Sequence, residues 1–173
     1  DPRLLSTVAP AVAKAAIESG VARKTIDNWE AYENELNSRL GLDNQMMRIL
    51  GNKAKRDPKR LVFAEADNHK ILKAASIIYD EGIAFPILLG EEARIRRIAE
   101  NNHIDLSDLP IINPRSDEME EKRNQYADMF FAKRQRKGFS LYDSKKVMRE
   151  RNYFGCMMVE QGDADGMVTG MRL

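Results

Sequence analysis

From Arg60 onward, short apolar segments alternate with longer segments that have the spacing of helices. The apolar segments are residues 61–64, 84–89, 109–112 and 166–169. The segments with helical spacing are residues 68–80, 91–101, 117–137 and 141–151. Strands separated by helices of this length pair in parallel, because the chain crosses over the sheet before each new strand begins. The pattern therefore predicts an α/β fold with a parallel sheet and helices on both of its faces.

The part of the chain before Arg60 has helical spacing throughout. Residues 7–19, 25–40 and 44–55 are each predicted to form a helix. The second of these helices repeats apolar side chains on one face, at Trp29, Tyr32, Leu36 and Leu40. Thr25 or Asp27 is expected to cap its start, and Gly41 to end it. We expect this helix to link two domains, with Trp29 and Tyr32 packed on a neighbouring domain or subunit.

The apolar run 153–160 fits either a helix or a strand and contains the single cysteine, Cys156. A single cysteine cannot form a disulfide within the chain, and its apolar neighbours predict a buried, inert thiol. A catalytic cysteine needs a nearby base, and both histidines are far away in sequence. Such cysteine usage is compatible with a reducing compartment, so we expect a cytoplasmic protein.

Charge and hydropathy exclude two classes of partner. The chain has 28 Lys and Arg against 27 Asp and Glu, which gives a formal net charge of +1. This near balance provides no electrostatic basis for binding nucleic acid. No apolar stretch reaches the roughly 20 residues that a membrane span needs, and the first residues lack the pattern of a signal peptide. We therefore expect neither a nucleic acid nor a membrane as a partner.

The segment 162–170 has the pattern of a strand that runs into a glycine-rich turn. Such a turn normally opens a helix whose first amides can hold an anion. The sequence ends at Leu173, before any such helix, so the chain is expected to be part of a larger protein, cut within a fold. Gly170 would allow a ligand to approach the backbone closely, and Thr169 offers a hydroxyl to such a ligand. A tight turn that serves only the fold also explains both residues.

Two groups of polar residues could form sites by their position in the sequence. Asp163 and Asp165 lack a third ligand nearby in the sequence, which favours a turn over a metal site, so no metal is expected here. The polar loop 65–69 follows a strand, at the edge where open α/β sheets bind ligands. Taken singly, its residues have simpler explanations, because Asp67 or Asn68 would cap the next helix and Glu65 would be solvated.

Basic residues gather at the end of the predicted helix 117–137, at Arg134, Arg136 and Lys137. Cations in the last turn of a helix offset its dipole without any ligand. The same residues could instead clamp a phosphate, because guanidinium binds phosphate bidentately and lysine adds a point charge. Both explanations remain open from the residues alone.

Four segments together resemble phosphate acetyltransferases: Leu-Val-Phe-Ala-Glu-Ala-Asp at 61–67, Glu-Gly-Ile-Ala-Phe-Pro-Ile-Leu-Leu-Gly at 81–90, Arg-Gln-Arg-Lys-Gly at 134–138 and Asp-Gly-Met-Val-Thr-Gly at 165–170. The resemblance covers residues 44–173 and implies a phosphotransacetylase-like fold, related to isocitrate and isopropylmalate dehydrogenases. It implies that Arg134 occupies the place of an arginine that helps to bind coenzyme A or its acyl-phosphate partner. It also makes Lys137, Thr169 and Gly170 candidate contacts for acetyl-CoA, with Thr169 where many members have serine.

The start of the chain resembles a different family. Residues 1–5 and 9–16 are similar to the closing segment of the NAD(P)-binding domain of bacterial malic enzymes. Both resemblances occur together in the large bacterial NADP-dependent malic enzymes with a fused phosphotransacetylase-like domain. This implies a closing segment at 1–22, a helical linker at 23–43, and the N-terminal part of the phosphotransacetylase-like domain at 44–173.

The double resemblance implies a function for the parent protein, the oxidative decarboxylation of malate to pyruvate with NADP and Mg or Mn. Neither cofactor is expected in the present segment, which would be non-catalytic. The segment would bind acetyl-CoA or a related acyl-CoA as an allosteric inhibitor. It would also hold the subunits of a homo-oligomer together. One alternative is a true phosphate acetyltransferase. The catalytic residues of that family lie in its C-terminal half, so no catalytic residue is named here. A purely structural oligomerisation module is the other alternative.

Overall fold

The computed structural model describes residues 3–38 and 42–170 and divides into two compact units. The helical unit is Asp1–Lys53 and the α/β unit is Ala54–Leu173. The helical unit contains α1 (Arg3–Glu18) and α2 (Trp29–Ser38), and α3 (Leu42–Arg56) runs across the boundary between the units. No helix within the described residues is long and apolar enough to cross a membrane.

In the helical unit, a contact between Lys14 and Trp29 joins α1 and α2. The Lys14 ammonium lies 5.0 Å from the centre of the Trp29 ring, within the range of a cation–π interaction. Trp29 and Tyr32 meet edge to face, with ring centroids 6.0 Å apart. Leu36 is buried. Trp29 therefore contacts α1 within the helical unit, and the packing of Trp29 and Tyr32 on a neighbouring domain or subunit stays a prediction.

Helix α2 begins later than the sequence pattern predicts. Neither Thr25 nor Asp27 caps it, because the Asn28 side chain accepts the Ala31 N–H at 2.9 Å and α2 begins at Trp29. The predicted end of this helix, at Leu40 and Gly41, lies outside the described residues.

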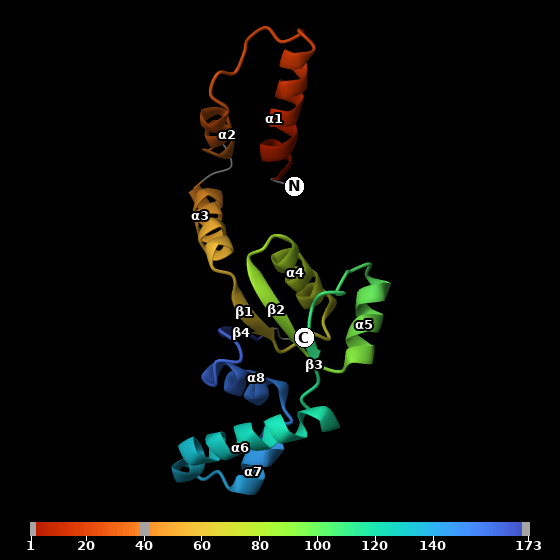
Figure 1. Ribbon diagram of the computed structural model, residues 1–173, viewed down its shortest axis with the longest axis vertical. Coiled ribbons are helices and arrows are strands. Elements are labelled where there is room, and N and C mark those ends of the chain that lie inside the picture. Colours follow the sequence, from red (N-terminus) through yellow and green to blue (C-terminus); the bar gives the residue numbers. More distant parts are fainter. Residues whose placement is uncertain (1–2, 39–41, 171–173) are drawn as a thin grey trace. The chain divides into compact units, whose positions relative to one another are not determined.

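The α/β unit is built on a four-stranded parallel sheet with strand order β3-β2-β1-β4 (Figure 1). The strands are β1 (Lys59–Phe63), β2 (Ala84–Leu89), β3 (Ile111–Ile112) and β4 (Gly166–Val168). In the register, Val62 of β1 lies opposite Ile87 of β2 on one side and Met167 of β4 on the other. The predicted parallel α/β sheet is confirmed.

Helices cover both faces of this sheet. They are α4 (His69–Asp80), α5 (Glu92–Asn101), α6 (Glu120–Arg134), α7 (Leu141–Val147) and α8 (Arg151–Glu160), with short 3-10 helices η1 (Asp117–Met119) and η2 (Gln135–Lys137). The predicted helix 117–137 is thus divided into three pieces, and the ambiguous run 153–160 is helical. The predicted helix 141–151 was too long, because α7 ends at Val147 and Arg151 already belongs to α8.

Two hydrophobic clusters show how successive strand residues point to opposite faces. Val62 and Leu89 pack against buried side chains of α6 and α8. Phe63 and Leu88 pack against buried side chains of α4 and α5. Because both faces are buried, the strands read as continuous apolar runs.

A hydrogen-bond network attaches the segment before β4 to the start of β1. The Arg60 guanidinium donates to both carboxylate oxygens of Asp165, at 2.9 and 3.1 Å, and the Arg60 N–H donates to Asp165 Oδ2 at 2.8 Å. The guanidinium also donates to the carbonyls of Gly162 at 2.8 Å and Asp163 at 3.0 Å. Asp165 therefore has a structural partner, as the turn interpretation expected.

An acid-dependent loss of stability follows from this network. Hydrogen bonding from Arg60 lowers the pKa of Asp165 to about 2, against about 3.9 in an unfolded chain. A carboxylate with a lowered folded pKa stabilises the fold above its unfolded pKa, and that contribution is lost as pH falls from about 4 towards 2. We expect Asp165→Asn to flatten the decrease of the urea midpoint between pH 6 and 3, whereas an exposed control, Asp108→Asn, should keep the wild-type slope. Equal slopes in all three proteins would contradict this account.

Candidate functional site

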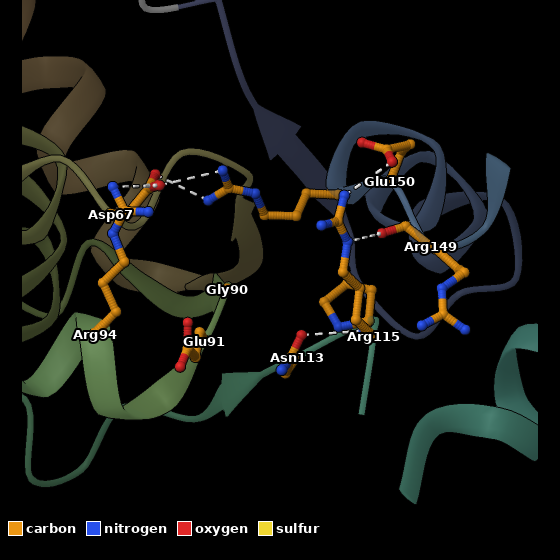
Figure 2. A pocket seen from close by; sticks show the side chains of 10 residues that line it. Asp67, Gly90, Glu91, Arg94, Asn113, Arg115, Arg149 and Glu150 are labelled. Atoms are coloured by element: carbon orange, nitrogen blue, oxygen red, sulfur yellow. Dashed lines mark hydrogen bonds and ion pairs between the residues drawn. The ribbon is translucent and has the colours of Figure 1, made fainter. Parts of the chain in front are cut away.

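The carboxyl ends of all four strands meet at one edge of the sheet, because the strands are parallel. A cavity of about 240 Å³ lies at this edge, between the segments that follow β1, β2 and β3 and the start of α8 (Figure 2). Four arginines and three carboxylates are among its lining residues: Arg94, Arg115, Arg149, Arg151, Asp67, Glu91 and Glu150. We refer to it as the arginine-lined cavity.

An ion pair between Asp67 and Arg151 forms part of the wall of this cavity. The Arg151 guanidinium donates to both carboxylate oxygens of Asp67, at 2.9 and 3.3 Å. A second guanidinium, of Arg94, lies 3.5 Å from Asp67. Hydrogen bonding from Arg151 is the main cause that lowers the pKa of Asp67, so this carboxylate stays charged at neutral pH.

The helix cap next to Asp67 is supplied by a different residue. The Asn68 side chain accepts the Lys70 N–H at 2.9 Å and is the N-cap of α4. Of the two caps that the sequence allowed, the structure therefore selects Asn68. Asp67 is left free to pair with Arg151, 84 positions further along the chain.

Arg115 is positioned by the loop that follows β3. Its side chain lies 2.9 Å from a carboxylate oxygen of Glu150 and donates to the carbonyl of Arg149 at 3.3 Å. Its backbone N–H donates to the Asn113 side chain at 3.0 Å. Arg123 of α6, which is buried, supports the same loop by donating to the carbonyls of Pro114 and Ser116. A guanidinium buried against carbonyls in this way fixes the loop that carries Arg115.

Thr169 and Gly170 form a second polar cluster at the same edge of the sheet. The Thr169 hydroxyl donates to Glu65 at 2.6 Å, and its oxygen lies 3.1 Å from the side-chain oxygen of Asn152. The Gly170 N–H donates to the same Glu65 oxygen at 3.1 Å. Glu65 is therefore an acceptor for two donors, and the expectation that it is only solvated was wrong. No local sequence pattern indicates that Glu65, after β1, would pair with Thr169 and Gly170, after β4.

Arg134 and Lys137 lie elsewhere in the α/β unit. Arg134 is the last residue of α6 and is exposed. Lys137 ends η2, directly before Gly138, whose φ of 89° allows the chain to turn. Lys137 lines a separate cavity of about 410 Å³ together with Phe139, Lys146 and Glu150. The structure thus divides the four predicted ligand residues between two places, and Glu150 lines both cavities.

The position of Cys156 differs from the sequence-based prediction. Cys156 is exposed, so the prediction of a buried thiol was wrong. The reason is that α8 is a helix whose residues Phe154, Gly155, Met157 and Met158 are buried, which leaves Cys156 on the opposite face.

Asp163 is also bound within the fold. It accepts a hydrogen bond from the Tyr126 hydroxyl and lies 2.8 Å from the Lys122 ammonium. Hydrogen bonding from Lys122, followed by that from Tyr126, lowers the pKa of Asp163. Over residues 3–38 and 42–170, the structure contains no group of three or more His, Cys, Asp or Glu side chains that could hold a metal ion.

Comparison with known proteins agrees with the fold and with both resemblances. A solved structure of the EutD phosphotransacetylase from Staphylococcus aureus superposes with a TM-score of 0.65 and 27% sequence identity, over 73% of this chain and 37% of that one. A phosphate acetyltransferase from Thermoanaerobacterium thermosaccharolyticum is 42% identical over 68% of this chain and 34% of its own length.

The match to malic enzymes is longer. An NADP-dependent malic enzyme from Rhizobium meliloti is 37% identical over 99% of this chain. The chain spans only about a fifth, 22%, of the length of that relative. Residues 45–172 match the model of the Phosphate acetyl/butaryl transferase family. By this match, which covers most of its length, the chain belongs to the Phosphate acetyl/butaryl transferase family.

Proposed function

We propose that this chain is part of an NADP-dependent malic enzyme, in which its α/β unit is a non-catalytic regulatory and assembly domain that binds acetyl-CoA. One observation carries the first part of this proposal. The similarity to the malic enzyme extends over 99% of the chain, whereas the similarity to the phosphate acetyltransferase covers 68%. The family match begins at residue 45, so it leaves the preceding helices without an explanation. A malic enzyme accounts for both units.

The reaction of the whole protein would be the oxidative decarboxylation of malate to pyruvate, with reduction of NADP. It would use NADP and Mg or Mn, and would take place outside the segment described here. The α/β unit would change the rate of this reaction by shifting the protein between two conformations. Such regulation requires that acetyl-CoA bind one of two conformations of the protein more tightly than the other. The same domain would hold subunits of a homo-oligomer together.

Within the α/β unit, Arg134 and Lys137 are the proposed contacts for the phosphate groups of acetyl-CoA. Both are exposed cations at the end of α6 and η2. Lys137 also lines a cavity large enough for part of such a ligand. Helix-end cations stabilise the helix whether or not a ligand is bound, so their position supports the proposal only together with the family membership.

Thr169 and Gly170 are the proposed contacts for a carbonyl or phosphate oxygen of the same ligand. Their O–H and N–H are donors at the carboxyl edge of the sheet. Both donors are directed to Glu65 in this structure, so a ligand oxygen would have to displace that carboxylate.

A phosphate acetyltransferase is the second candidate function, because the similarity to that enzyme is 42% identity over the matched region. It would move an acetyl group between coenzyme A and phosphate. An acetyltransferase would convert acetyl-CoA and phosphate to products, whereas a regulatory domain would bind acetyl-CoA unchanged. Assaying the full-length protein for acetyl phosphate formation separates the two.

The binding site is tested by calorimetric titration of acetyl-CoA into the full-length protein and its Arg134→Ala and Lys137→Ala variants. A lost hydrogen bond to a charged group costs about 1.5–3 kcal/mol, so each variant should bind about 10- to 100-fold more weakly. Arg97→Ala, which removes an exposed arginine on α5, is the matched control and should bind like the wild type.

Two results would change the proposal. Unchanged affinity in the Arg134→Ala and Lys137→Ala variants would remove these residues from the ligand site. No heat of binding in the wild type would leave a domain that serves assembly alone.

A further inference from the structure

The arginine-lined cavity collects positive charge from separate parts of the chain (Figure 2). Arg94 comes from the first turn of α5 and Arg115 from the loop after β3. Arg149 precedes the N-cap residue of α8, and Arg151 is the first residue of that helix. Charged side chains that converge on one cavity from three segments are not explained by the stability of any single helix. The arginines differ in how firmly they are paired within the fold.

One of the four arginines, Arg151, is firmly paired within the fold. Arg151 and Asp67 form a bidentate pair with side-chain exposures of only 36% and 22%. A bidentate pair of this kind holds both groups in one geometry. This pair therefore forms part of the cavity wall and is not available to bind a ligand.

Arg94 and Arg115 are held more weakly than Arg151. Arg94 is 56% exposed and lies 3.5 Å from Asp67, which is already paired with Arg151. The pair of Arg115 with Glu150 is about as exposed, at 62% and 59%, and the other side-chain hydrogen bond of Arg115, to the Arg149 carbonyl, is long at 3.3 Å. Exposed ion pairs of this kind contribute only about 0–1 kcal/mol. Both guanidinium groups can therefore turn to a ligand at small cost.

The backbone around the cavity favours an anion as well. Glu91 and Glu150 are the N-cap residues of α5 and α8, and both line the cavity. Neither makes a side-chain cap hydrogen bond, so the first-turn amides of both helices keep unused donors. The positive ends of two helix dipoles add to the charge of the arginines.

We propose that the arginine-lined cavity binds a phosphate group, with Arg94 and Arg115 as its side-chain ligands. Guanidinium groups match the oxygens of a phosphate in paired hydrogen bonds, and they do so better than they match a spherical anion. The cavity of about 240 Å³ is also far larger than a single water requires, which is about 10–15 Å³. Neither Arg134 nor Lys137 lines this cavity, although Glu150 lines both this cavity and the one next to Lys137. The proposal does not depend on the identity of the parent enzyme.

The test is a pair of calorimetric titrations into the full-length protein, one with inorganic phosphate in chloride buffer and one with acetyl-CoA. Each is repeated with Arg94→Ala, Arg115→Ala and the double variant. Arg97→Ala, an exposed arginine on the same helix as Arg94, is the control. We expect affinity to fall about 10-fold or more in each single variant and further in the double variant, with the control unchanged.

The two ligands distinguish the source of the phosphate group. If the variants weaken the binding of inorganic phosphate, the site takes a free phosphate ion. If they weaken only acetyl-CoA, the site takes a phosphate group of the coenzyme. The proposal is overturned if both ligands bind the Arg94 and Arg115 variants as tightly as the wild type, or if neither ligand binds the wild type. The outcome with Arg134→Ala does not enter this test, so the two site assignments can fail separately.

Discussion

Replacing Phe154 with alanine is expected to lower the free energy of unfolding of the α/β unit by about 3–5 kcal/mol. Phe154 is only 1% exposed and lies on the face of α8 that packs on the sheet. Its ring centre is 5.1 Å from that of Tyr126, which is also buried, on α6. Removing the ring would therefore leave a cavity where α6, α8 and the sheet meet, which the close-packed surroundings can fill only in part.

Urea unfolding of the wild type and the variant measures this effect. Tyr142→Ala is the control, because Tyr142 is 77% exposed and its truncation should change stability by no more than about 0.5 kcal/mol. If Phe154→Ala were as mild as Tyr142→Ala, then α8 would not be packed on the sheet as described.

A second large effect is expected from adding volume to the neighbouring residue, Gly155. A Cβ at this position would lie 2.5 Å from Met167 Sδ, 3.2 Å from Val62 Cγ1 and 3.3 Å from Leu89 Cδ1. The Met167 side chain can move, but the branched side chain of valine would also press on β1 and β2. We expect Gly155→Val to destabilise the α/β unit by about 1–3 kcal/mol, the usual cost of overpacking.

Hydrogen exchange can localise the damage from Gly155→Val. Amides of β1 and β4 should exchange faster in the variant, because α8 must move away from these strands. Gly51→Val is the matched control, since a Cβ at Gly51 in α3 has no atom within 4 Å. Unchanged protection of β1 and β4 in Gly155→Val would show that the helix does not lie this close to the sheet.

The parts of the fold that the sequence predicted are those set by local patterns. The predicted strand 84–89 coincides with β2, because glycines at 82 and 90 interrupt the neighbouring segments. The cap at Asn68 is equally local, since its side chain bonds to a backbone amide two positions away. The burial of Cys156 was mispredicted because an apolar run does not reveal which face of a helix meets the sheet.

The contacts between side chains at the carboxyl edge of the sheet were harder to predict than the helices and strands. Gly170 is a candidate from the sequence because glycine permits close backbone approach or a tight turn, and its φ of 111° is in the region that favours glycine. The pairing of Asp67 with Arg151 had no such signal. A charge that meets its partner 84 positions away follows no period in the sequence and becomes visible only when the strands are in register.

We propose that this chain belongs to a malic enzyme whose activity is controlled through a phosphotransacetylase-like domain. The most direct test is the rate of malate-dependent NADP reduction by the full-length protein at increasing concentrations of acetyl-CoA. We predict a measurable rate that falls as acetyl-CoA is added, and less inhibition in Arg134→Ala. Formation of acetyl-CoA from acetyl phosphate and coenzyme A, without any oxidation of malate, would contradict the claim and identify an acetyltransferase instead.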